Sequence, residues 1–221
     1  MTGVVATPVT VAVIAKECRP GLVKTRLHPP LSLEQAADVA AASLHDTLQV
    51  VRALPADRRV LFFEGHAADA VRDGFEVLPQ PSGGLDERLG ALFDAVDGPL
   101  LLVGMDTPQI TAAAVAPFFD GVATAAGSRV TAWFGPALDG GFWALGLTAA
   151  APGRRRGDLI RGVPMSRDDT GAVQRRRLVE AGCDVVDLPA LRDIDTIDDL
   201  TAVRDAHPHL TTAAAARAVP A

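Results

Sequence analysis

Residues 9–15 read VTVAVIA, and they lead directly into residues 16–27, which read KECRPGLVKTRL. The first segment is almost wholly apolar and rich in β-branched side chains, a pattern typical of a central strand that is covered on both faces. The second segment carries four cationic side chains around one glycine. A buried strand followed by such a loop indicates an α/β protein, in which ligands bind beyond the carboxyl ends of the strands.

Outward from this point, short apolar runs alternate with segments of helical period. We expect strands at residues 9–15, 59–63, 99–103, 129–134, 141–147 and 183–188. We expect helices at residues 33–53, 67–72, 84–96, 111–119, 170–181 and 196–206. Strands separated by helices predict a single-domain, three-layer α/β/α sandwich with a mostly parallel sheet.

The bulk properties of the 221-residue chain exclude several classes of protein. A net charge of −6 and a pI near 5.3 argue against nucleic-acid binding, which requires a basic face. We see neither an apolar run long enough to cross a membrane nor a signal peptide, so we expect a cytoplasmic protein without a membrane partner. We assign residues 1–210 to one domain and expect residues 211–221, which are rich in alanine, to be frayed or disordered.

The loop after the first strand is the first candidate binding site. Lys16, Arg19, Lys24 and Arg26 surround Gly21 there, and several point charges of this kind can hold a polyphosphate. The alternative is a solvated basic loop, but its position after the first strand favours phosphate contact. The loop matches neither a Walker loop nor the dinucleotide fingerprint, which argues against an ATPase or a dehydrogenase.

One cysteine lies within the same loop. Because cations surround Cys18, its thiol is expected to have a lowered pKa. No histidine pairs with it in the sequence, so we do not expect it to act as a nucleophile.

A second candidate site follows the third expected strand. Asp106 comes shortly after Gly104, at a position where a carboxylate can hold Mg²⁺ against a nucleotide phosphate. It could equally cap the turn before Pro108, and the sequence leaves both interpretations open. Asp193 and Asp195 precede the predicted helix cap at residue 196, and one of them could supply a second metal ligand.

A third candidate site lies at residues 135–143, which read GPALDGGFW. The paired Gly140 and Gly141 permit close approach of the backbone to a ligand. Asp139 could bind a substrate hydroxyl group, and Trp143 could stack on a ring. A hairpin turn would also explain Asp139 and Gly140, and a lone tryptophan is more often part of a core.

Five segments in this order resemble a known bacterial family: AKECRPGLVKTRL (residues 15–27), SGGLDERLGALF (82–93), VGMDTPQIT (103–111), GPALDGGFWALGL (135–147) and LRDIDTIDDL (191–200). The family comprises predicted transferases related to nucleotide-diphospho-sugar transferases, often labelled as glycosyltransferases of the arsenosugar-biosynthesis type. The resemblance covers roughly residues 9–206. Residues 24–27 (KTRL) are also similar to the phosphate loop of phospholactate guanylyltransferases.

The resemblance implies a glycosyltransferase-A type fold and a role for each candidate residue. It implies that Lys16, Arg19, Lys24 and Arg26 approach the nucleotide phosphates, together with Gly21 and Gly104. It also implies Asp106 as the main metal ligand, with Asp195 the favoured partner and Asp193 the second choice. The expected catalytic residues are therefore Asp106, Lys24 and Arg26, and the expected cofactor is Mg²⁺ or Mn²⁺.

The function expected from these features is metal-dependent transfer from a nucleotide sugar or a nucleoside triphosphate to a small-molecule acceptor. Glycosyl transfer is slightly favoured. The alternatives are a guanylyl- or cytidylyl-type nucleotidyltransferase that acts on a small phosphorylated acceptor, and an inactive nucleotide-binding module. A homodimer is compatible with the sequence.

Overall fold

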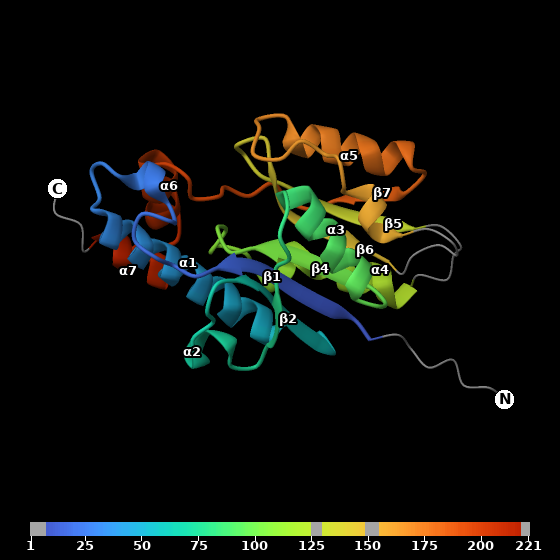
Figure 1. Cartoon of the computed structure of the whole chain (residues 1–221), viewed down its shortest axis with the longest axis horizontal. Helices are drawn as coiled ribbons and strands as arrows, with labels where there is room; N and C mark the ends of the chain where they lie inside the picture. Colours follow the sequence, from blue (N-terminus) through green and yellow to red (C-terminus); the bar gives the residue numbers. More distant parts are fainter. Residues whose placement is uncertain (1–7, 125–129, 149–154, 218–221) are drawn as a thin grey trace.

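A computed structural model describes residues 8–124, 130–148 and 155–217. In these residues, seven strands form one sheet in the order β3-β2-β1-β4-β6-β5-β7 (Figure 1). The strands are β1 (Thr10–Lys16), β2 (Arg58–Glu64), β3 (Glu76–Pro79), β4 (Leu100–Gly104), β5 (Thr131–Pro136), β6 (Phe142–Leu147) and β7 (Asp184–Asp187).

Helices connect the strands of this sheet and extend beyond it. The helices are α1 (Leu33–Ala53), α2 (Asp69–Arg72), α3 (Leu85–Ala95), α4 (Ala112–Thr124), α5 (Thr170–Glu180), α6 (Ile197–Ala206) and α7 (Thr211–Arg217). Two short 3₁₀ helices, η1 (Thr25–Leu27) and η2 (Arg156–Leu159), lie in loops.

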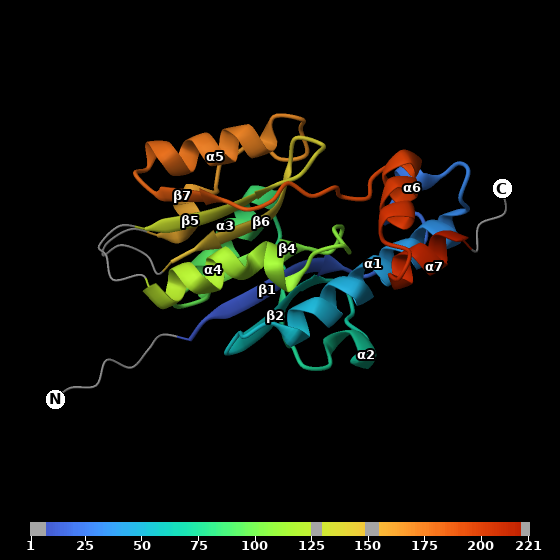
Figure 2. The same ribbon diagram turned by 180° about the vertical axis from the view of Figure 1, so that it is seen from behind.

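The helices cover both faces of the sheet (Figure 1 and, from behind, Figure 2). On one face, side chains of α1 and α4 pack with alternate residues of the strands, among them Leu44, Phe118 and Val103. On the other face, side chains of α3 and α5 do the same, among them Phe93 and Leu178. This arrangement confirms the predicted three-layer α/β/α sandwich.

The connectivity creates a switch point between β1 and β4. β1 pairs in parallel with β2 on one side and with β4 on the other. β6 runs antiparallel between β4 and β5, so the sheet is mixed but mostly parallel. Because the loops after β1 and β4 diverge at their carboxyl ends, this is the edge at which ligands bind in such folds.

The long helix α1 begins and ends where its sequence predicts. The Ser32 hydroxyl accepts a hydrogen bond from the Gln35 N–H, and the Gln35 side chain accepts one from the Ser32 N–H. This capping box satisfies two N–H groups that have no partner within the helix. The helix ends before Leu54, which precedes Pro55, a residue that disfavours helical backbone at the position before it.

Two local predictions differ from the structure. The sequence does not predict β3, because this short strand (Glu76–Pro79) pairs only with β2 and is largely exposed, so it lacks an apolar run. Helix α4 continues to Thr124, five residues beyond the expected end at residue 119, although it contains Pro117. Burial of Val115 and Phe118 against the sheet stabilises α4 despite the hydrogen bond that proline cannot donate.

The predicted frayed or disordered end does not hold for residues 211–217, which form α7. This helix packs against α1 and α6, beyond one end of the sheet (Figure 1). The carboxylate of Asp46 in α1 accepts hydrogen bonds from the N–H groups of Thr211 and Thr212, and from the Thr212 hydroxyl. Alanines give a helix little to bury alone, but here Ala213 and Ala216 are covered by other helices. Residues 218–221 lie outside the described residues.

In the part of the chain that the structure describes, no helix is both long enough and apolar enough to cross a membrane.

Candidate functional site

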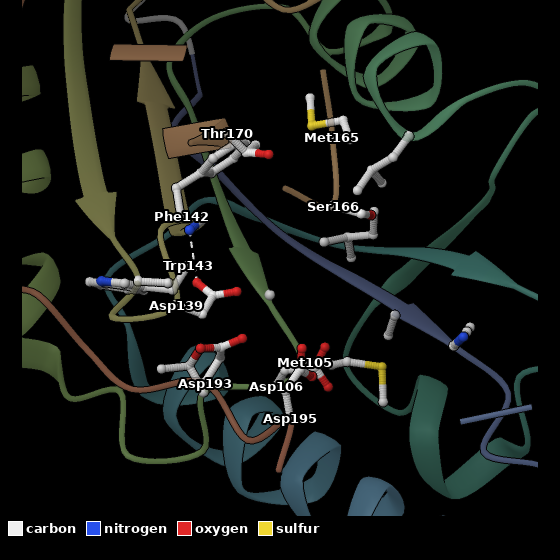
Figure 3. A pocket seen from close by; sticks show the side chains of 18 of the residues that line it. Met105, Asp106, Asp139, Phe142, Trp143, Met165, Ser166, Thr170, Asp193 and Asp195 are labelled. Atoms are coloured by element: carbon white, nitrogen blue, oxygen red, sulfur yellow. Dashed lines mark hydrogen bonds between the residues drawn. The ribbon is translucent and has the colours of Figure 1, made fainter. Parts of the chain in front are cut away.

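A cavity of about 770 Å³ opens at the carboxyl ends of the central strands. Its walls include the loop after β1, the loop after β4, the β5–β6 turn and the segment that follows β7. Figure 3 shows Asp106 and Asp195 together at one side of this cavity, with Asp193 and Asp139 beside them. Four segments that are far apart in the sequence therefore contribute to one site.

An ion-pair cluster centred on Lys24 lies in the wall of this cavity. The Lys24 ammonium is 2.8 Å from Oδ1 of Asp106 and 2.9 Å from Oδ1 of Asp195. Its side chain is 6% exposed, whereas both carboxylates retain contact with solvent. Burial opposes the charge of this ammonium, but Asp106 and Asp195 hold the pKa of Lys24 above its ordinary value.

The local backbone positions these groups. Lys24 adopts a left-handed conformation (φ 47°) at the start of η1. The Lys16 ammonium donates a hydrogen bond to the carbonyl of Leu22, which closes the loop. The N–H of Ile194, between Asp193 and Asp195, donates to the carbonyl of Asp106. That bond joins the segment after β7 to the loop after β4.

Three carboxylates form a second cluster beside Lys24. Asp139, Asp193 and Asp195 each offer an oxygen atom within 4.8 Å of the other two. Burial raises the pKa of Asp193 to about 6, and the charges of Asp139 and Asp195 add to the effect. Like charges this close repel one another, and carboxylate oxygens are preferred ligands of Mg²⁺ and Mn²⁺. The residues therefore fit a divalent cation.

The β5–β6 turn requires a glycine at position 140. Gly140 has a φ of +91°, and a Cβ atom there would overlap the carbonyl oxygen of Asp168. The N–H of Gly171, in the first turn of α5, donates to the carbonyl of Gly140, so the turn and the start of α5 lie together in the wall of the cavity. The hairpin interpretation explains the local bond from the Gly141 N–H to Asp139, but the close approach to Asp168 depends on the tertiary structure.

The structure brings most of the candidate residues together. The cavity lining includes Lys16, Lys24, Arg26, Gly104, Asp106, Asp139, Gly141, Trp143, Asp193 and Asp195. Arg26 is 73% exposed and lies 3.3 Å from Asp195. Among the described residues, the lining does not include Arg19, Gly21 or Gly140. Arg19 instead pairs with Glu17 at the exposed side of the loop, at 3.0 Å.

The ring of Trp143 belongs to the core. This residue is only 3% exposed, and its indole N–H donates to the carbonyl of Pro189 at 3.0 Å. The packed ring has no free face on which a substrate ring could stack. Trp143 instead fixes the segment that leads to Asp193.

The expected low pKa of Cys18 is wrong. Burial raises the pKa of this thiol to about 11, and the negative charge of Asp106 adds to the effect. The nearby lysines oppose this shift but do not outweigh it. Cys18 is therefore a thiol rather than a thiolate at neutral pH.

Three polar residues that were not predicted line the cavity near β2, β3 and α3: Glu64, Gln80 and Arg88. The Gln80 amide donates to the carbonyls of Ala15 and Phe62, and its oxygen accepts from Arg88. Arg88 also donates to Glu64 at 2.9 Å. The sequence could have indicated Glu64 as a site residue. It ends β2 beside Lys16, the last residue of β1, at the same edge of the sheet.

The sequence also matches a family. Residues 44–167, more than half of the chain, match DUF2064, described as an uncharacterized protein conserved in bacteria. The chain belongs to this family. No curated protein matches the chain.

Solved structures with the same fold include a candidate nucleotide-diphospho-sugar transferase from Desulfovibrio desulfuricans. It has a TM-score of 0.80 and 23% identity, over 96% of this chain and 94% of that one. The Rv0371C protein of Mycobacterium tuberculosis, in complex with manganese, has a TM-score of 0.51 and 23% identity, over 90% and 98%. CMP:2-keto-3-deoxy-manno-octonic acid synthetase, complexed with CTP, has a TM-score of 0.53 and 12% identity, over 91% and 99%. These likenesses confirm the predicted nucleotide-diphospho-sugar transferase-like fold.

Proposed function

We propose that this member of DUF2064 is a divalent-cation-dependent transferase that uses a nucleotide donor. The observation that carries the proposal is the Lys24 ammonium held between Asp106 and Asp195 at the edge of the sheet where ligands bind. Asp139 and Asp193 add two more carboxylates to the same cavity. Such a concentration of acid beside cationic groups suits a metal–polyphosphate complex.

The metal would be held by Asp195, which belongs to both clusters, together with Asp106 and with Asp193 or Asp139. When bound, Mg²⁺ or Mn²⁺ supplies positive charge that neutralises phosphate oxygens. Support for the choice of metal comes from the Rv0371C protein, whose structure contains manganese.

The cationic side chains would bind and orient the donor. Lys16 and Arg26 line the cavity beside the carboxylates, and Arg26 is exposed enough to reach a ligand. An arginine can hold two phosphate oxygens at once, whereas a lysine supplies a point charge. Fixed charges of this kind stabilise a phosphate leaving group as negative charge develops on it.

We favour glycosyl transfer from a nucleotide sugar. In that reaction an acceptor hydroxyl attacks the anomeric carbon of the sugar, its proton is released, and the nucleoside diphosphate leaves. Asp139, at the β5–β6 turn, would bind a sugar or acceptor hydroxyl.

The second candidate is nucleotidyl transfer, which the CTP-bound synthetase of the same fold supports. There an acceptor oxygen attacks the α-phosphorus of a nucleoside triphosphate and pyrophosphate leaves. The same carboxylates and cations would serve both reactions.

A thermal-shift measurement with Mn²⁺ and separate panels of nucleotide sugars and nucleoside triphosphates tests the proposal. A ligand at about one hundred times its Kd adds about 2.7 kcal/mol to the free energy of unfolding. We expect a Mn²⁺-dependent shift with one panel, and that panel identifies the donor class. If neither panel shifts the midpoint, with or without Mn²⁺, the proposed function is wrong.

A further inference from the structure

We propose that Lys24 is a built-in counter-cation: its ammonium occupies the position between Asp106 and Asp195 until a divalent metal displaces it, and it then binds the donor phosphates. This inference rests on the proposed metal-dependent function. It assigns Lys24 two alternative partners, the carboxylates in the metal-free protein and phosphate in the loaded one. Lys24 thereby links metal binding to donor binding.

The distances make the two cations mutually exclusive. The Lys24 ammonium lies 2.8 Å and 2.9 Å from Oδ1 of Asp106 and of Asp195, so it already occupies one lone-pair region of each oxygen. A Mg²⁺ ion binds carboxylate oxygens at about 2.1 Å and requires near-ideal octahedral geometry. A metal that binds the same two Oδ1 atoms would lie against the ammonium. Lys24 must therefore leave when such a metal binds.

The surrounding charges favour this exchange. Asp139 and Asp193 lie beside Asp195, so Lys24 and Arg26 provide two positive charges for four carboxylates and leave them under-neutralised. A divalent ion offers twice the charge of a single ammonium to the same oxygens. Because the carboxylates of Asp106 and Asp195 retain contact with solvent, a metal can reach them without opening the fold.

The displaced ammonium has a second partner within the same cavity. The backbone of Lys24 is anchored, because its carbonyl accepts a hydrogen bond from the N–H of Leu27, the last residue of η1. Its side chain has four rotatable carbon–carbon bonds and can turn while the backbone stays in place. Lys16 and Arg26, the proposed phosphate ligands, line the cavity around it. A polyphosphate would therefore receive a third cation only after the metal has displaced Lys24.

The test measures Mn²⁺ binding to the whole protein without nucleotide, from the electron paramagnetic resonance signal of free Mn²⁺. Lys24→Met removes the competing ammonium. The matched control, Lys16→Met, removes a positive charge from the same cavity, but this lysine donates to a backbone carbonyl rather than to a carboxylate. We expect Lys24→Met to bind Mn²⁺ about tenfold more tightly than the natural protein, the ratio that corresponds to one ion pair of about 1.4 kcal/mol. Lys16→Met should change the affinity by less than about threefold.

Several outcomes would overturn the inference. If Lys24→Met binds Mn²⁺ no more tightly than the natural protein, Lys24 does not compete with the metal, and the proposed function is unaffected. An equal gain in Mn²⁺ affinity in Lys16→Met would mean that any lysine in the cavity weakens Mn²⁺ binding by general charge repulsion. If neither the natural protein nor any variant binds Mn²⁺, the metal dependence of the proposed function is wrong as well. Lys24→Gln, which keeps a polar group, gives the same test if the methionine variant melts early.

Inorganic pyrophosphate provides the second measurement. In the natural protein, saturating Mn²⁺ should tighten pyrophosphate binding, after correction for the complex that the two form in solution, because the metal frees Lys24. Linkage requires the reciprocal effect on Mn²⁺. We expect this coupling to fall about tenfold in Lys24→Met. Equal coupling in both proteins would contradict the second role of Lys24.

Discussion

Asp46 is buried and Asp193 is half-buried, and the groups around the two carboxylates differ in kind. Asp46, in α1, is 7% exposed and accepts hydrogen bonds of 3.1, 2.8 and 2.7 Å from three donors at the start of α7. Asp193, beside the cavity, instead has Asp139 and Asp195 within 4.8 Å. Hydrogen-bond donors surround the first carboxylate, whereas burial and the like charges around the second raise its pKa.

The contrast shows that a buried acid does not by itself mark a functional site. A carboxylate that accepts three hydrogen bonds holds two helices together and has at most one lone pair left for a ligand. A carboxylate that lies beside other carboxylates lowers the stability of the metal-free protein. A bound cation neutralises this repulsion. The partners of the acid, rather than its burial, distinguish the two regions.

The largest expected effect is on activity, at the cavity. Asp106→Asn removes the charge that we propose holds the metal, and kcat/KM should fall roughly 100- to 1,000-fold at saturating Mn²⁺. The fold should be retained, because this side chain is partly exposed. The assay is donor turnover, with the melting midpoint as the control. Undiminished turnover with a normal Mn²⁺ requirement would contradict the role of Asp106 as a metal ligand.

The next effect is on stability, away from the cavity. Asp46→Ala leaves the donors at the start of α7 unpaired and should lower the free energy of unfolding by about 3 kcal/mol, or the midpoint by roughly 6–12 °C. Asp38→Ala, at an exposed position of the same helix, is the matched control and should change stability by less than about 0.5 kcal/mol. Mn²⁺ affinity should stay unchanged in both. A loss of Mn²⁺ binding in folded Asp46→Ala would contradict the purely structural role of Asp46.

Asp193→Asn should raise the stability of the metal-free protein by on the order of 1 kcal/mol, after allowance for solvent screening, while it weakens Mn²⁺ binding. The folded pKa of this carboxyl is raised from 3.8 to about 6. Its destabilising effect is therefore complete above pH 6 and disappears as the pH falls towards 4. The stability difference between variant and natural protein should follow the same course in urea titrations. A variant that is less stable than the natural protein at pH 7 would show that Asp193 has a structural partner.

The smallest effect is expected at an exposed ion pair. Arg175 and Asp187 form two short hydrogen bonds of 2.8 and 2.7 Å between α5 and β7. Because both side chains remain exposed, Asp187→Asn should cost less than about 1 kcal/mol, and high salt should reduce the difference. A larger loss of stability, measured by urea denaturation, would mean that the short hydrogen bonds of this pair matter more for its contribution to stability than the exposure of its side chains.

The sequence predicts the elements better than it predicts their partners. Helix α1 agrees at both ends because its cap, its apolar stripe and the proline after it are local signals. β3 and α7 were missed or misjudged because their stability depends on β2 and on α1, which no local pattern reveals. The same limit applied to the cavity. Its four segments were predicted from the ends of strands, but the sequence left the core position of Trp143 open and did not indicate Glu64, Gln80 and Arg88.

The sequence by itself determined the alternation of strands and helices, and it determined which loops follow the strands at the ligand-binding edge. Those features depend on the side-chain period and on turn chemistry within a few residues. The tertiary structure alone decided that Lys24 meets Asp195, 171 positions away, and that Asp139 joins Asp193. Electrostatic pairing depends on distances of a few ångströms between distant segments, and only the packed sheet sets those distances.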